Sequence, residues 1–277
     1  MDNLRLRSSM KQFLMEDIGE RDITTEAIFP GHTEGEVTFL AKESGIFCGE
    51  DIIRTGFHIL NPHIHVQLLV RDGEAISTGQ QLATVSGEIT ALLKAERVVL
   101  NLIQRMSGIA TLTKDAIKAL NSPHTRITDT RKTTPGLRMM EKYAVRCGGG
   151  YNHRFGLYDA VMIKDNHISF AGSIKQAVQR VHETVGHMVK IEVETESKDQ
   201  VAEAVDSGVD VIMFDNCTPD QIKEFIKLVP EHIITEASGG IDLNDLSSYS
   251  STGVDYISLG FLTHSYKALD ISVKVNL

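Results

Sequence analysis

The second half of the chain alternates short apolar segments with amphipathic ones, and this alternation limits the possible folds more than any other feature. The apolar segments are residues 126–130, 160–165, 189–195, 211–216, 233–240 and 255–260. The segments with helical spacing between them include residues 173–185, 198–208 and 219–229. Apolar strands that alternate with amphipathic helices are typical of a parallel sheet built from βα units. Six such units favour a β/α barrel, with an open sheet as the alternative.

The first hundred residues have a different pattern. Residues 36–49, 63–70 and 81–87 read as strands, and residues 71–80 read as a turn between two of them. Because no regular crossover helix follows these strands, we expect an antiparallel sheet. Residues 88–120 then take on helical spacing, and Gly108 is expected to separate two helices.

Each predicted parallel strand ends in a charged, small or glycine residue. In chain order these are Arg131 and Lys132, then Lys164, Glu194, Asp215, Ser238-Gly239-Gly240 and Gly260. The carboxyl ends of the strands of a β/α barrel meet at one mouth, where active sites lie. We therefore expect these residues, though far apart in sequence, to line one cavity.

The segment from Arg126 to Lys164 is a cationic island in an acidic protein. It has eight Lys/Arg and three Asp/Glu, a local charge of +5, whereas the remaining 20 basic and 34 acidic residues give −14. Buried cations are costly unless they are paired. The island therefore predicts a site for a polyanionic small molecule, and a set of internal ion pairs is the alternative.

Individual residues of the island suit anion recognition. Arginine binds carboxylates or phosphates in a bidentate manner and lysine acts as a point charge, so Arg131 and Lys132 are candidates, with a solvated turn as the alternative. Lys164 near a barrel axis needs an anion, which a ligand or a structural ion pair with Glu194 or Asp215 would supply.

Glycines and carboxylates complete the expected cavity. Glu194 and Asp215 can hold Mg²⁺ through oxygen ligands or stabilise developing positive charge, unless they only neutralise lysines. Ser238-Gly239-Gly240 and Gly260 fit a phosphate site at the last two strands, or else tight turns. The glycine triplet 148–150 can bring backbone N–H groups close to an anion, or it can cap a helix.

Composition excludes several functional classes. The net charge of −9 argues against general nucleic-acid binding, and no apolar run approaches a membrane span. The start of the chain lacks the apolar stretch of a signal peptide. Three widely spaced cysteines (Cys48, Cys147 and Cys217) argue against a disulfide framework and for a reducing, cytoplasmic compartment, where we interpret them as packing residues.

The segment DTRKTTPGLRMMEKYAVRCGGGYNHRFGLYDAVMIKDNH, residues 129–167, resembles the characteristic region of the quinolinate phosphoribosyltransferase family. The resemblance extends to ERVVLNLIQRMSGIAT before it, and to IEVET, MFDN, EASGGI and DYISLGFLTHS after it. LMEDIGERDITT is also similar, except that Arg21 stands where the family usually has glycine. The match covers nearly the whole chain.

The resemblance implies a reaction and an architecture. Quinolinate and phosphoribosyl pyrophosphate would give nicotinate mononucleotide, pyrophosphate and CO₂, with Mg²⁺, in de novo NAD biosynthesis. The fold implied is an N-terminal α/β sandwich (residues 1–105, completed by residues 267–277) and a C-terminal incomplete β/α barrel (residues 106–266). The assembly implied is a homodimer with sites shared between subunits.

The resemblance also implies roles for individual residues. Quinolinate would be bound by Arg131, Lys132, His153, Arg154 and Lys164, with Arg97 supplied by the neighbouring subunit. Glu194 and Asp215 would face the ribose and its metal. The 5′-phosphate would be bound by Ser238, Gly239, Gly260 and His264.

Two other functions fit the sequence less well. A paralogue with the same scaffold, such as the molybdenum-locus relative, would act on another base, and substrate preference would distinguish it. A non-catalytic anion-binding protein would have no need of Glu194 and Asp215 facing its ligand.

Overall fold

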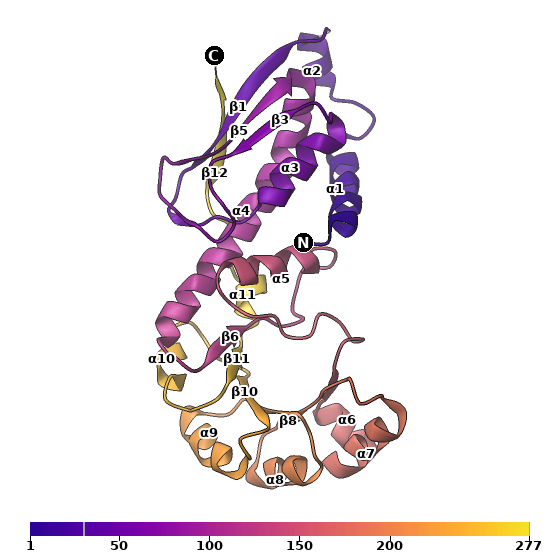
Figure 1. Ribbon diagram of the computed structural model, residues 1–277, viewed down its shortest axis with the longest axis vertical. Coiled ribbons are helices and arrows are strands. Elements are labelled where there is room, and N and C mark those ends of the chain that lie inside the picture. The colour runs from indigo at the N-terminus through magenta and orange to yellow at the C-terminus, as the bar shows by residue number, and fades with distance from the viewer. Residues whose placement is uncertain (30, 277) are drawn as a thin grey trace. The chain divides into compact units, whose positions relative to one another are not determined.

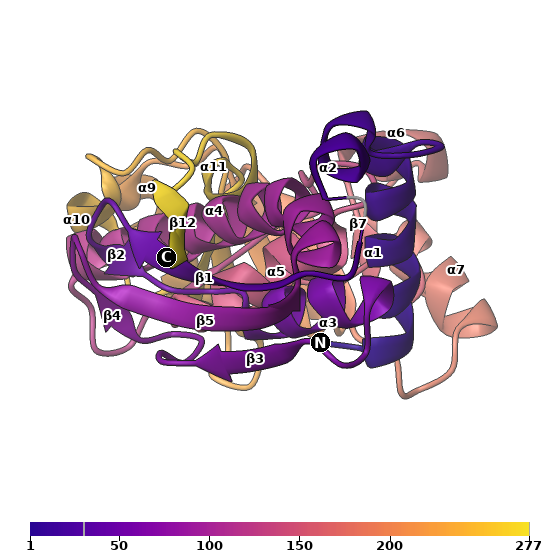
Figure 2. The same ribbon diagram turned by 90° about the horizontal axis from the view of Figure 1, so that it is seen from above.

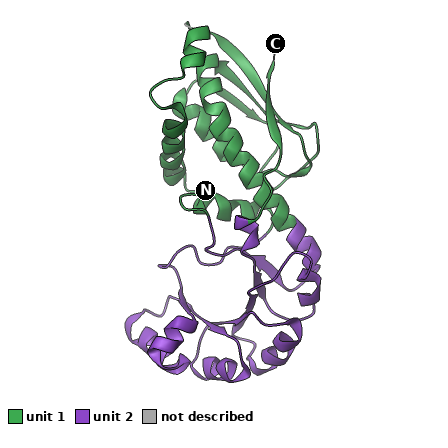
Figure 3. Cartoon of the chain, turned by 180° about the vertical axis from the view of Figure 1, so that it is seen from behind, with its two compact units in different colours: residues 1–114, 134–149, 265–277 green, residues 115–133, 150–264 purple. Residues whose placement is uncertain are grey.

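The computed structural model describes residues 1–29 and 31–276, which divide into two compact units. The first unit comprises residues 1–114, 134–149 and 265–277, and the second comprises residues 115–133 and 150–264 (Figure 3). Both units are therefore built from separate stretches of the chain. Leu277, the last residue of the segment expected to complete the sandwich, lies outside the described residues.

The first unit contains a four-stranded antiparallel sheet, in the order β12-β1-β5-β3 (Figure 1). Its strands are β1 (Glu34–Ala41), β3 (His65–Leu68), β5 (Gln81–Glu88) and β12 (Ile271–Asn276). The last strand, β12, pairs antiparallel with β1, and Val37 lies opposite Val275. A small second sheet joins β2 (Gly45–Ile46) to β4 (Ala75–Ile76), so the segment expected to be only a turn contains a strand.

Five helices belong wholly or largely to this unit. They are α1 (Asn3–Ile18), α2 (Ile23–Ile28), α3 (Glu50–Leu60), α4 (Ile89–Leu120) and α5 (Arg138–Cys147). Asp2 and Asp22 begin α1 and α2 by accepting N-cap hydrogen bonds. The helix α3 is a centre of packing, because Phe57 meets Phe39 of β1 edge to face and Gly56 lies against Val99 of α4. Figure 2 shows α1 beyond one end of the strands.

The expected helix break at Gly108 is wrong, because α4 runs without interruption from Ile89 to Leu120. A Cβ atom at Gly108 would lie 2.2 Å from the carbonyl oxygen of Lys267 and 3.1 Å from Cα of Ala268. Glycine stands there because another backbone segment crosses the helix at that point.

The second unit contains a six-stranded parallel sheet, in the order β6-β11-β10-β9-β8-β7. The strands are β6 (Arg126–Thr128), β7 (Val161–Ile163), β8 (Ile191–Thr195), β9 (Val211–Asp215), β10 (Ile234–Ser238) and β11 (Tyr256–Ser258). All six strands lie where the sequence predicts them. They curve around an arc with helices on the outer side (Figure 3). The two expected architectures, an N-terminal α/β sandwich and a C-terminal incomplete β/α barrel, are thereby confirmed.

The helices of the second unit follow the strands in turn. They are α6 (Asp165–Ala171), α7 (Ile174–Thr184), α8 (Lys198–Asp206), α9 (Pro219–Phe225) with the 3₁₀ turn η1 (Ile226–Leu228), α10 (Leu246–Tyr249) and α11 (Phe261–His264). Thr218 and Gln221 form a capping box at the start of α9. Buried side chains such as Ile212 and Phe214 line the sheet and bind these helices to it.

Among the described residues, no helix is long and apolar enough to cross a membrane.

Candidate active site

A cavity of about 870 Å³ lies at the carboxyl ends of the parallel strands. Its lining residues all belong to the second unit. Twelve of the residues singled out from the sequence line it: Arg131, Lys132, His153, Arg154, Lys164, Glu194, Asp215, Ser238, Gly239, Gly240, Gly260 and His264. The barrel topology therefore gathers residues from six strands into one site.

Lys164 and Glu194 face each other across neighbouring strands. The Lys164 ammonium contacts Glu194 Oε1 as a hydrogen-bonded ion pair, and the Glu194 side chain is only 14% exposed. Burial raises the pKa of the Glu194 carboxyl, although the hydrogen bond and charge of Lys164 act in the opposite direction. The structural ion pair expected as an alternative is thus present, but it lies inside the cavity, where either partner can also meet a ligand.

Lys164 is fixed by the start of α6. Its backbone N–H donates to Nδ1 of His167, three residues on, at 3.0 Å. This contact explains why Asp165, Asn166 and His167 begin a helix directly after β7. It also leaves the Lys164 side chain directed from the strand end toward Glu194.

His153 is held by buried acidic groups on its far side. Its Nε2 lies 3.0 Å from Oε2 of Glu192 and 3.7 Å from Oε1 of Glu236, and both carboxylates are at least 93% buried. Its backbone N–H donates to Oδ1 of Asp129, whose side chain is fully buried. These contacts orient the ring at the cavity wall, so Glu192, Glu236 and Asp129 act on the site without lining it.

Asp129 and Glu236 were not predicted from the sequence as site residues, and no contact with His153 was predicted for Glu192. Side-chain alternation along a strand was the available signal, because Glu192 shares a face with Glu194, and Glu236 shares one with Ser238. Burial raises the pKa of Glu236 to about 8, and the neighbouring Glu192 charge adds to this effect. Glu236 therefore keeps its proton over part of the neutral pH range.

Two guanidinium groups stand together at the cavity. Burial lowers the pKa of Arg154, and the charge of Arg131 lowers it further. One Arg154 Nη donates to the carbonyl oxygen of Ala160 at 2.9 Å, which fixes the guanidinium. Two adjacent cations repel each other, and an anion bound between them would relieve that repulsion.

Close backbone contacts shape the opposite part of the cavity. Gly239 has a φ of 86°, and a Cβ atom there would lie 2.7 Å from the backbone nitrogen of Asn216. A Cβ atom on Gly260 would lie 2.9 Å from Cδ of Lys132 and 3.2 Å from Nε2 of His264. Gly239 therefore has to be glycine, whereas at Gly260 a side chain would have to displace the flexible Lys132 and His264 side chains. The exposed backbone at these two positions suits a phosphate group.

Thr263 ties the Lys132 segment to this part of the cavity. Its hydroxyl donates to the Lys132 carbonyl oxygen at 2.7 Å. The hydroxyl of Thr130 accepts from the Lys132 N–H at 3.0 Å. The backbone of Lys132 is thus fixed while its side chain remains exposed.

The cations of the island, which the sequence predicts to form one polyanion site, are divided between the two units. Arg131, Lys132, Arg154 and Lys164 line the cavity. Three other cations of the island, Arg138, Lys142 and Arg146, belong to α5 in the first unit, where they also have partners. Only the first set is therefore placed where it could meet a ligand of this cavity, and the ligand site itself stays a prediction.

The glycine triplet and Arg97 lie away from the cavity lining. Gly148 caps α5, and a Cβ atom there would lie 2.4 Å from the carbonyl oxygen of Ala110, so its role is the helix-capping alternative. Arg97 is exposed on α4 and is not among the described residues that line the cavity.

A parallel β/α sheet with clustered cations, carboxylates and glycines at its strand ends defines an enzyme-like site for an anionic small molecule. The chain matches the quinolinate phosphoribosyl transferase N-terminal domain over residues 22–107 and the C-terminal domain over residues 109–274. Together these matches cover most of the chain.

Individual relatives agree. A probable nicotinate-nucleotide pyrophosphorylase (carboxylating) of Bacillus subtilis is 54% identical over 277 residues, which cover all of this chain and 96% of the relative. A mitochondrial quinolinate phosphoribosyltransferase (decarboxylating) of Nicotiana tabacum is 41% identical, over 98% of this chain and 82% of the relative. The crystal structure of NadC from Streptococcus pyogenes superimposes with a TM-score of 0.96 at 39% identity, covering 100% of this chain and 98% of that one.

The chain belongs to the quinolinate phosphoribosyltransferase family. Its activity is that of a phosphoribosyltransferase of NAD biosynthesis, of the nicotinate-nucleotide diphosphorylase (carboxylating) type.

The raised pKa of Glu236 predicts a pH-dependent stability. Because its folded pKa, about 8, lies above the ordinary 4.5, the folded state binds the proton more tightly than the unfolded chain. The stabilisation is complete below about pH 4.5 and is lost as the pH rises toward 8. Glu236→Gln removes this proton, so we expect its unfolding free energy to fall less than that of wild type between pH 5 and 8.

Urea unfolding at several pH values measures the effect, which for one proton is at most about 1.4 kcal/mol per pH unit. Glu231→Gln is the matched control, because Glu231 is exposed. If the Glu236→Gln and wild-type stability curves run parallel, Glu236 does not hold the proton.

Proposed function

We propose that the cavity binds quinolinate and phosphoribosyl pyrophosphate side by side and couples them directly. The observation that carries the proposal is the presence in one cavity of adjacent cations, two carboxylates and a glycine-shaped backbone. A dicarboxylate and a polyphosphorylated sugar need these three kinds of group. A simple anion trap would have no use for Glu194 and Asp215.

The quinolinate carboxylates meet the cationic side. Arg131, His153, Arg154 and Lys164 bind them, and Lys132 stands between the base and the phosphates. The fixed guanidinium of Arg154 and the anchored ring of His153 reduce the entropy lost on binding. The 5′-phosphate is placed against Ser238, Gly239 and Gly260, with His264 beside it.

The chemistry then needs positioning and charge rather than a general base. The pyridine nitrogen of quinolinate attacks the anomeric carbon as the carbon–oxygen bond to pyrophosphate breaks. Glu194 and Asp215 stabilise the positive charge that develops on the ribose. The resulting pyridinium accepts the electron pair of the adjacent C–CO₂ bond, CO₂ leaves, and a solvent proton replaces it. Quinolinate, the sugar pyrophosphate and one proton thus become nicotinate mononucleotide, pyrophosphate and CO₂.

Glu194 and Asp215 also fit a magnesium ion. Both carboxylates line the cavity and offer the oxygen donors that this ion prefers. Bound there, Mg²⁺ would neutralise charge on the departing pyrophosphate.

The free thiols Cys48, Cys147 and Cys217 suit a reducing, cytoplasmic compartment.

Arg97 completes the proposal through a homodimer. It is exposed on its own chain and absent from the lining of that chain's cavity. An exposed arginine on a rigid helix can serve the cavity of a second copy, and twofold symmetry would then give each cavity one partner arginine.

The direct test is release of ¹⁴CO₂ from quinolinate labelled in its 2-carboxylate. We expect release only with phosphoribosyl pyrophosphate and Mg²⁺ together. Lys164→Ala should lower kcat/KM at least 100-fold, about 2.7 kcal/mol of transition-state stabilisation. Lys175→Ala, which removes an exposed lysine of α7, is the control and should remain active. Turnover of nicotinate with none of quinolinate would disprove the proposal.

The shared site is tested by complementation. Arg97→Ala and Lys164→Ala subunits, each inactive alone, are given different affinity tags, and the heterodimer is purified through both. One of its two cavities would be intact, so it should show about half of the wild-type activity. An inactive heterodimer would show that Arg97 does not act in the partner's cavity.

A further inference from the structure

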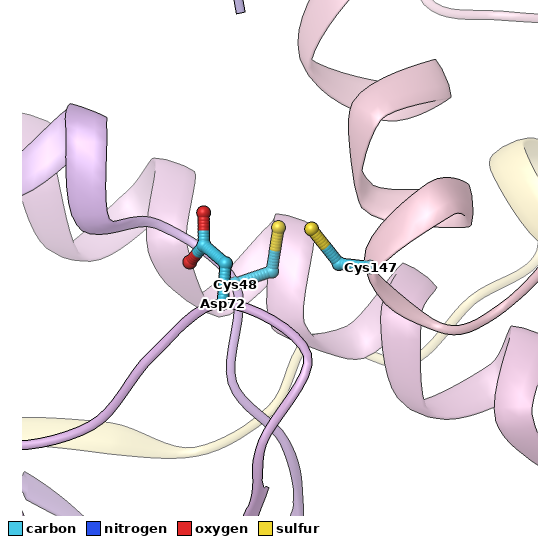
Figure 4. A group of neighbouring side chains, drawn as sticks. All are labelled: Cys48, Asp72 and Cys147. Atoms are coloured by element: carbon cyan, nitrogen blue, oxygen red, sulfur yellow. The ribbon is translucent and has the colours of Figure 1, made fainter.

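Two cysteines far apart in sequence meet inside the first unit. Cys48 lies between β2 and α3, and Cys147 is the last residue of α5. Their sulfur atoms and a carboxylate oxygen of Asp72 all lie within 4.8 Å of one another. Figure 4 shows the two sulfur atoms side by side. Sequence spacing gave no sign of this pair.

The segments that carry both cysteines contact the same helix, α4. The Cys48 N–H donates to the hydroxyl of Ser107 at 3.0 Å, and that hydroxyl lies 3.3 Å from the Cys48 carbonyl oxygen. Gly148, next to Cys147, packs against the carbonyl of Ala110 so closely that a side chain would not fit. Both cysteine segments are thus anchored to the same helix.

The geometry disfavours a metal site at this position. Asp72 already accepts hydrogen bonds at Oδ1 from the N–H groups of Gly49 (2.6 Å) and Glu50 (3.1 Å), and at Oδ2 from the Tyr143 hydroxyl (2.8 Å). Its function is to cap α3. The two sulfurs are therefore a thiol pair.

We propose that Cys48 and Cys147 are a modification site that hydroperoxides convert into a reversible disulfide. Cys48 is fully buried and Cys147 is only half-buried, so a small oxidant reaches Cys147 first. Cysteine pairs that form disulfides in reducing compartments are usually transient and redox-responsive. This site is separate from the cavity and does not depend on the activity proposed for it.

The reaction balances with hydrogen peroxide as the oxidant. The Cys147 sulfur attacks one peroxide oxygen, the O–O bond breaks, and one water leaves with Cys147 as the sulfenic acid. The Cys48 sulfur then attacks the Cys147 sulfur, the S–O bond breaks, and the Cys48 proton leaves with the hydroxyl as a second water. Two thiols have been oxidised and one peroxide reduced, and an added dithiol reverses the change.

The experiment exposes the full-length protein, under native conditions, to a small excess of hydrogen peroxide, then blocks free thiols and maps tryptic peptides without reduction. Cys48 lies in the peptide 43–54 and Cys147 in the peptide 147–154, each with one cysteine. We expect these peptides to be linked, the intact mass to fall by about 2 Da from loss of two hydrogens, and titratable thiols to fall from three to one. Dithiothreitol should restore all three thiols.

Variants separate this proposal from other outcomes. Cys217→Ser is the matched control, because it removes the third cysteine, and it should leave the linked peptide unchanged. In Cys48→Ala, Cys147 should stop at the sulfenic acid, which dimedone traps. Three titratable thiols after treatment, oxidation of Cys147 beyond the sulfenic acid without linkage, or equal linkage of Cys48 to Cys217 would each overturn the proposal.

Discussion

The site depends on two neighbouring guanidinium groups, Arg131 and Arg154, which line the same cavity. Burial lowers the pKa of Arg154, and the positive charge of the neighbouring Arg131 lowers it further. The protein holds them there because other groups carry the balancing charge. The carboxylates Glu192, Asp159 and Glu194 act in the opposite direction on the Arg154 pKa, and Glu192 also holds His153. A bound dianion would supply the remaining charge.

The parallel sheet makes this arrangement possible. Alternate residues of a strand face the same side, so Glu192 supports His153 from below while Glu194 reaches the cavity from the same strand. The same relation holds for Glu236 and Ser238 on β10. Glu192 and Glu236 therefore position His153, whereas Glu194 and Ser238, two residues further along the same strands, line the cavity.

Local patterns in the sequence were sufficient to predict the barrel strands and the residues at their carboxyl ends. The apolar segments and the polar residues that follow them predicted all six barrel strands and the cavity residues at the strand ends. His153, Arg154 and His264 were predicted only through the family resemblance. What the sequence could not reveal depends on contacts between distant segments. Gly108 looked like a helix break because nothing nearby shows that the backbone at Lys267 crosses α4. Likewise, the support of His153 by Glu236 and the meeting of Cys48 with Cys147 arise only from the fold.

The central claim is that the cations of the cavity recognise two adjacent carboxylates. Inhibition of the reaction by benzene-1,2-dicarboxylate and by benzoate tests it most directly, because neither compound has the ring nitrogen that reacts. The dicarboxylate should compete with quinolinate and inhibit about 10- to 100-fold more strongly than benzoate, as expected for one additional hydrogen-bonded charge. Equal inhibition constants for the two compounds would contradict the account.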